Sequence, residues 1–137
     1  MGIFWPAYLH PLAAETALAL GDLPAAREHC DRAEELSWMD LKPAAARLLK
    51  ARGLVQAVEQ SWEEAVALIR QASELYEANG QPYDRARCLE ALAEVYRRRG
   101  DSEDETRAAA SVREAGAIYQ RIGAEFEVRR IEQGAIR

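Results

Sequence analysis

The chain has 137 residues, a length typical of one domain with a modest hydrophobic core. Hydrophobic residues make up 49% and charged residues 30%, which indicates a soluble globular protein and argues against a disordered one. The 18 basic and 23 acidic residues leave a net charge of −5, which argues against a dedicated binder of nucleic acids or anionic membranes.

Alanine content and apolar periodicity predict an all-α fold. The sequence contains 27 alanines, and alanine favours helices and fills sheets poorly. The expected helices cover about residues 7–20, 23–37, 43–58, 62–79, 83–99, 103–122 and 124–135. Gly21-Asp22, Gln60-Ser61 and Gly100-Asp101 predict tight turns, and Pro43 and Pro82 suit the first turn of a helix.

A pattern of small and aliphatic residues recurs about every forty residues. It occupies positions i, i+4, i+7 and i+10 in three segments: Ala26, Cys30, Ala33 and Leu36; Ala65, Ile69, Ala72 and Leu75; Ala108, Val112, Ala115 and Ile118. In the alternate helices, small residues recur at Ala14, Gly53 and Ala93, where they would let two helices approach closely. Tyr76 and Tyr119 are also equivalent in the second and third copies, where we expect them to be packed.

Such two-helix units cannot bury their apolar faces alone and must stack. We therefore expect one domain over residues 1–137, an α-solenoid of three helix-turn-helix pairs. The repeats would cover about 7–42, 43–81 and 82–123. The largely polar segment 124–137 would form a capping helix at the C-terminal end.

Three groups of residues carry a family resemblance: Gly21-Asp22-Leu23 with Ala26 and Ala33, Trp62 with Ala65 and Ala72, and Ala93 and Tyr96 with Gly100-Asp101. They resemble tetratricopeptide (TPR) repeats, although the period of about forty exceeds the nominal period of about 34 residues. Such lengthened repeats are similar to those in the C-terminal part of bacterial LuxR-type ATP-dependent transcriptional regulators. The resemblance implies a right-handed solenoid whose first helix in each pair lines a concave surface.

That layout places six charged residues on the concave surface: Arg47, Lys50, Arg87, Glu94, Arg97 and Arg98. A basic groove suits an acidic peptide or a free C-terminal carboxylate. TPR domains that clamp a carboxylate usually add asparagines, and Leu54 and Ala91 occupy the equivalent positions, which argues against a specific clamp. The other interpretation is that these six residues are an ordinary solvated surface.

An apolar cluster near the N-terminus has no preceding helix to cover it. It contains Phe4, Trp5 and Tyr8. Because solenoids need a polar cap at each end, the cluster indicates either self-association through this edge as a homo-oligomer or excision from a longer array.

Metal-binding and catalytic signals are weak. The candidate ligands are His10, His29, Cys30 and Cys88, but adjacent residues such as His29 and Cys30 point about 100° apart on a helix. Both cysteines suit a core, and two cysteines make no disulfide framework, so we expect a reduced, cytoplasmic protein. The acidic run Glu103-Asp104-Glu105 is expected to be solvated at a helix start. We therefore expect no enzyme, no metal and no cofactor.

The sequence favours a protein–protein interaction module that binds a protein or peptide partner on its concave face. One alternative is an effector-sensing segment of a LuxR-type regulator that binds a small molecule. The other is a structural repeat domain that assembles with itself. No run of 18 apolar residues predicts a membrane span, and no helix is left over to read nucleic acid. The ATPase motif Gly-x-x-x-x-Gly-Lys-[Ser/Thr] is also absent, so the chain is either a stand-alone protein or a piece of a larger one.

Overall fold

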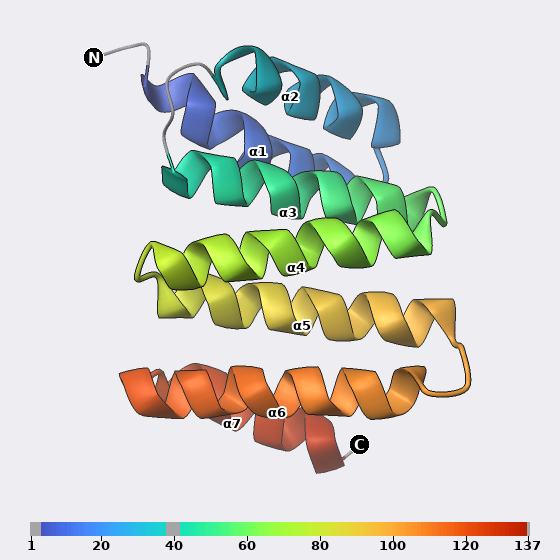
Figure 1. Cartoon of the computed structure of the whole chain (residues 1–137), viewed down its shortest axis with the longest axis vertical. Coiled ribbons are helices and arrows are strands. Elements are labelled where there is room, and N and C mark those ends of the chain that lie inside the picture. Colours follow the sequence, from blue (N-terminus) through green and yellow to red (C-terminus); the bar gives the residue numbers. More distant parts are fainter. Residues whose placement is uncertain (1–3, 38–41, 137) are drawn as a thin grey trace.

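The computed structural model of the chain describes residues 4–37 and 42–136 (Figure 1). Within these ranges the chain forms helices and no strand, which confirms the predicted all-α class. The helices are α1 (Phe4–Ala19), α2 (Leu23–Glu35), α3 (Lys42–Val58), α4 (Trp62–Ala78), α5 (Pro82–Arg99), α6 (Asp104–Ile122) and α7 (Glu125–Ile136). Among the described helices, none combines the length and the apolar character needed to cross a membrane.

Along the long axis α3, α4, α5 and α6 follow one another in chain order, with α1 and α2 at one end, where α1 lies next to α3, and with α7 beside α6 at the other end (Figure 1). The main helix contacts join chain neighbours, and α1 also packs on α3. Among the described residues the core is divided into three buried clusters, one around α1, α2 and α3, one that extends from α3 to the start of α6, and one around α5, α6 and α7. Each helix therefore depends on its immediate neighbours for burial.

The repeated small residues form the buried sides of α2, α4 and α6. Ala26, Ala65 and Ala108 are each fully buried, and they occupy equivalent positions of the three copies. Tyr76 and Tyr119, the predicted pair of packed tyrosines, are 2% and 0% exposed. Burial of these residues confirms that the periodicity marks the packing side of each helix.

The predicted turns are present, and one of them has a feature that the sequence did not indicate. Gly100 and Gly123 end α5 and α6 in the left-handed conformation, with φ of 73° and 75°. The turn between α3 and α4 contains no glycine, and Gln60 adopts φ 64° there instead. A side chain in this region is uncommon, because its Cβ crowds the backbone.

The N-terminal boundary of α1 differs from the expected start near residue 7. The helix begins at Phe4, because Pro6 falls in the first turn, where a backbone N–H would have no partner in any case. Pro11 lies inside α1 and is fully buried. The expected helix over residues 7–20 also contains Pro11, and α1 continues past it.

The expectation that Asp104 is solvated is wrong. Asp104 is only 1% exposed, and its carboxylate accepts hydrogen bonds from Arg99 Nε at 2.9 Å and Nη2 at 2.7 Å. It also accepts one from the backbone N–H of Asp101 at 2.9 Å. These hydrogen bonds, above all those from the guanidinium of Arg99, hold the pKa of Asp104 well below its usual range. This contact pins the turn between α5 and α6.

A close approach between α3 and α4 explains the small residue at position 53. A Cβ added to Gly53 would lie 2.6 Å from Ile69 Cγ1 and 3.2 Å from the carbonyl oxygen of Ala65. Gly116, inside α6, differs because a Cβ there would lie 3.9 Å from Ile131 Cγ2, an ordinary contact distance. The predicted close packing at residue 53 is therefore confirmed.

Substituting alanine for each of these two glycines should change the free energy of unfolding in opposite directions. Gly53→Ala should lower the free energy of unfolding by about 1–2 kcal/mol, because the clash exceeds the gain in helix propensity. Gly116→Ala should raise it by about 0.5–1 kcal/mol, since only the propensity changes. Urea unfolding followed by circular dichroism measures both, and a stabilising Gly53→Ala would refute the close approach.

Candidate functional site

A cleft with a volume of about 680 Å³ is lined by residues of α1, α3, α5, α6 and α7. We call it the charged cleft. Its charged lining residues are Glu15 of α1, Lys50 of α3, Arg87, Glu90, Glu94 and Arg97 of α5, and Arg130 of α7. Its apolar lining consists of Ala19, Leu54, Ala91, Ala93 and Val112. The cleft thus combines four cations and three carboxylates over a small apolar surface.

The structure gathers only part of the predicted concave set. Lys50, Arg87, Glu94 and Arg97 line the charged cleft. Arg47 instead forms an ion pair with Asp84 at 3.8 Å. Arg98 lies over the ring of Trp62, with its guanidinium carbon 5.8 Å from the ring centroid, a cation–π contact.

Of the three residues predicted to mediate self-association, the structure describes the side chain of Tyr8 alone. The side chains of Phe4 and Trp5 lie outside the described residues. Tyr8 is described and is 36% exposed, and its neighbours Leu9 and Leu12 are 50% and 46% exposed. This end of α1 therefore presents apolar side chains to solvent, and self-association stays a prediction.

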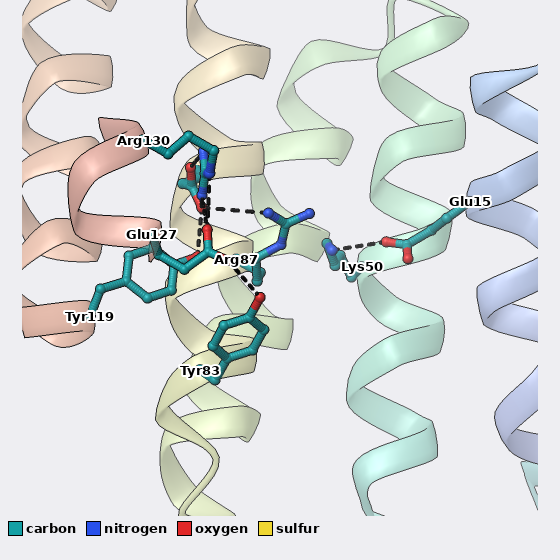
Figure 2. Close-up of polar contacts among 8 residues, drawn as sticks. Glu15, Lys50, Tyr83, Arg87, Tyr119, Glu127 and Arg130 are labelled. Atoms are coloured by element: carbon teal, nitrogen blue, oxygen red, sulfur yellow. Dashed lines mark hydrogen bonds and ion pairs between the residues drawn. The ribbon is translucent and has the colours of Figure 1, made fainter. Parts of the chain in front are cut away.

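Lys50 is already paired within the protein. Its ammonium lies 3.0 Å from Glu15 Oε1, so the pair joins α3 to α1 (Figure 2). Both side chains are largely buried, at 16% and 19% exposure. The distance is that of an ion pair, although the geometry at this Glu15 oxygen is not that of a hydrogen bond. Lys50 therefore contributes less positive charge to a ligand than sequence reasoning expected.

Arg130 ties α7 to α5 through Glu90 (Figure 2). Its Nη1 and Nη2 donate to the two oxygens of Glu90 at 2.6 and 2.9 Å. The hydroxyl of Tyr119 also donates to Glu90, at 2.6 Å. Burial by itself would raise the pKa of Glu90, but the hydrogen bonds from Arg130 and Tyr119 outweigh it and leave the pKa below its usual value. Glu90 is therefore ionised at neutral pH.

Glu127 completes this network on the α7 side. It accepts from Arg130 Nε at 2.9 Å and from the Tyr83 hydroxyl at 3.0 Å. The hydrogen bond from Arg130 is the largest cause that lowers the pKa of Glu127. Two carboxylates thus hold one guanidinium, and Arg130 is committed to positioning α7.

Arg87 is the least engaged cation of the cleft. Its guanidinium points between the Arg130 network and Lys50 (Figure 2). The nearest carboxylate oxygen belongs to Glu90, at 3.9 Å, and the Arg87 side chain is 46% exposed. Among the described residues it makes no hydrogen bond within 3.5 Å, so its five N–H donors remain open to an acceptor.

The importance of Glu90, Glu127 and Arg130 was missed from the sequence. Glu127 and Arg130 are three residues apart on one helix, a spacing that suggests an ion pair. The bond from Arg130 to Glu90 spans 40 residues and depends on how α7 folds back. No periodicity in the sequence indicates that contact.

The histidines and cysteines occupy two different environments. Nδ1 of His10 lies 3.0 Å from Nδ1 of His29, a contact between α1 and α2. Cys30 and Cys88 are free and fully buried, and burial raises the pKa of Cys88 to about 12, so its thiol stays protonated at neutral pH. The described ranges contain no cluster of three or more His, Cys, Asp or Glu residues arranged to hold a metal ion.

A scan against protein-family models found no match, and searches of the curated proteins and of the solved structures found no similar protein. The chemistry of the charged cleft is therefore the basis for assigning a function. The Lys50–Glu15 pair and the Arg130–Glu90 pair link the helices that line the cleft, and Arg87 lies between these two pairs.

Removal of the Glu90 charge should release α7. Glu90→Gln should speed amide hydrogen exchange at Val128–Glu132 about fivefold, equal to about 1 kcal/mol, because the pair with Arg130 is only partly shielded from solvent. Glu94→Gln is the matched control, since Glu94 lines the same cleft on the same helix and is exposed. Equal protection of α7 in the Glu90→Gln variant and the wild type would show that the ion pair does not hold the helix.

The histidine contact should make stability fall in mild acid. Burial, and then the charges of His29 and Arg32, lower the pKa of His10 from 6.5, while Glu35 acts in the opposite sense. Since the unfolded state then binds the proton more tightly, this contribution is present above pH 6.5 and is lost as the pH falls below it. When the pH is lowered from about 7.5 to about 5.5, Tm should fall in both proteins. We expect the fall to be smaller in His10→Gln than in the wild type. An equal drop in both proteins, measured by calorimetry, would exclude a role for His10.

Proposed function

We propose that the chain is a TPR-like α-solenoid of three helix pairs with a C-terminal capping helix, and that it works as a protein-interaction module. It binds an acidic peptide segment of a partner protein in the charged cleft. The observation that carries this proposal is the open guanidinium of Arg87 inside a cleft of about 680 Å³. The free, buried thiols of Cys30 and Cys88 support a place in the cytoplasm, where thiols stay reduced.

The position of the cleft supports a peptide ligand. Its lining comes from α1, α3, α5 and α7, with Val112 of α6 between them. The first helices of the pairs are the ones that TPR resemblance assigns to a concave binding surface. A groove lined by several helices suits an extended segment that lies along α5, because the neighbouring helices contribute contacts to its sides.

The charges of the cleft favour an acidic ligand. Its lining residues carry one net positive charge, whereas the whole chain carries −5, although Glu127 beside the lining also binds Arg130 and offsets that charge. Lys50 is paired with Glu15, and Arg130 is paired with Glu90. Arg87 and Arg97 are therefore the cations left to bind the partner. Arg97 contacts Glu105 at 3.3 Å, but both side chains are exposed, and such surface pairs are worth little.

The spacing of these arginines predicts the spacing of acidic residues in the partner. Arg87 and Arg97 are ten positions apart on α5, a rise of about 15 Å along the helix. An extended peptide covers that distance in about four to five residues. Glu94 lies between the two arginines and would repel an acidic residue there. The best peptide therefore carries two carboxylates four or five residues apart with a neutral or basic residue between them.

Peptide selection gives a direct test of this proposal. Randomised peptides displayed on phage are selected against the immobilised full chain, and the enriched sequences are compared with a set of the same composition in scrambled order. Enrichment of the two-acid spacing would support the proposal. Enrichment of acidic peptides without any preferred spacing would refute the geometric part of it, and no enrichment would refute peptide binding.

Affinity measurements on variants then locate the site. Arg87→Glu should weaken binding of a selected fluorescent peptide about tenfold or more, because a charge-assisted hydrogen bond is replaced by repulsion. Arg113→Glu is the matched control, since Arg113 is exposed on α6 and does not line the cleft. Fluorescence polarisation gives both dissociation constants. An equal loss in the two variants would show diffuse attraction to the surface.

A further inference from the structure

A second pocket lies between α4 and α6, above α5, and shares no lining residue with the charged cleft. Its volume is about 370 Å³. Three arginines, Arg70, Arg85 and Arg107, come from three different helices. The other polar lining residues are Ser73, Glu74, Tyr96, Ser111 and Glu114.

Arg70 provides a cation without a carboxylate partner. Its Nη2 donates to the hydroxyl of Tyr96, and within the described ranges no carboxylate oxygen lies within 4.0 Å of its guanidinium. Because the Tyr96 oxygen accepts this bond, its own O–H remains available to donate. A guanidinium and a phenol thus present donors side by side at the pocket.

Two further donors of the pocket also lack acceptors among the described residues. Arg85 Nη2 donates to Glu114 at 2.7 Å, but its Nε is buried and has no hydrogen-bond partner. The Ser73 hydroxyl also makes no hydrogen bond within the described ranges, but its oxygen keeps contact with solvent, so the penalty of a buried unpaired donor falls on Arg85 Nε. A buried donor without an acceptor is unfavourable, and a ligand that supplies the acceptor removes that penalty.

Most charged side chains of the pocket stand at its rim, since Arg70 and Arg107 are exposed as well as the two carboxylates. The Glu114 side chain is 49% exposed and is held by Arg85, and Glu74 is also exposed. The hydroxyls of Ser73 and Tyr96 belong to residues that are almost fully buried. Arg85 pairs with Glu114, and Arg107 pairs with Glu103 and Asp104, so among the described residues Arg70 is the pocket arginine left without a carboxylate partner.

We propose that this pocket binds a phosphate-class oxyanion, as free phosphate or as the monoester of a small molecule. A tetrahedral phosphoryl group offers three or more acceptor oxygens in different directions, which matches donors that arrive from α4 and α5. A planar carboxylate offers only two. The volume of about 370 Å³ leaves room for a small group attached to the phosphate.

Titration calorimetry on the full chain at constant ionic strength tests the proposal with three probes. These are inorganic phosphate, O-phosphoserine and acetate. Saturable binding of either phosphate probe at about 10 mM or below, with weaker binding of acetate, is the expected result. Phosphate and phosphoserine distinguish a free anion from a monoester. No saturation by either phosphate probe, or equal binding of acetate, would overturn the proposal.

Three variants assign the binding to the pocket. Arg70→Gln should weaken phosphate binding about tenfold to a hundredfold, and Tyr96→Phe about threefold to tenfold, because they remove a charged and a neutral donor. Arg113→Gln, on an exposed part of α6 outside the pocket, should change it less than about twofold. Circular dichroism checks that each variant is folded. A loss in Arg113→Gln as large as in Arg70→Gln would overturn the assignment.

Discussion

Close contact between helices, made possible by small side chains, is the constraint on which the rest of this structure depends. Gly53 leaves no room for a Cβ against Ile69, and fully buried alanines occupy the equivalent packing positions of α2, α4 and α6. Small residues bury little apolar area each, so many contacts along the row of helices must add up to the stability of the fold. The three separate core clusters show the result, since each helix is stabilised by its neighbours and not by a single centre.

Charged side chains then join the helices to one another. Lys50 and Glu15 connect α3 to α1, Arg130 and Glu90 connect α7 to α5, and Arg99 and Asp104 pin the turn between α5 and α6. A thin alanine-rich core leaves long side chains at the margins of the helices, where they reach across to one another. These ion pairs also decide which cations remain free for a ligand. Arg87 and Arg70 differ from the arginines around them, which form close ion pairs with carboxylates. Both keep N–H donors that can bind a ligand.

Both proposed sites lie on α5, and they differ in the chemistry of their ligands. The charged cleft is long, open and mixed in charge, which favours a peptide held at several points. The pocket between α4 and α6 is smaller and has donors on almost fully buried residues, which favours a compact oxyanion. Arg97 and Tyr96 are adjacent in sequence yet line the two different sites, because successive residues of a helix point about 100° apart.

The sequence by itself determined the helices, their turns and their packing sides. Alanine content and the recurrence of Ala26, Ala65 and Ala108 are local or periodic signals, and helix formation and burial follow directly from them. It also predicted that Lys50, Arg87, Glu94 and Arg97 would share one surface. The tertiary structure alone decided the burial of Asp104, the contact of His10 with His29 and the bond from Arg130 to Glu90. The physical reason is that a charged side chain can choose among several partners within its reach, and only the three-dimensional path of the backbone determines which partner is there.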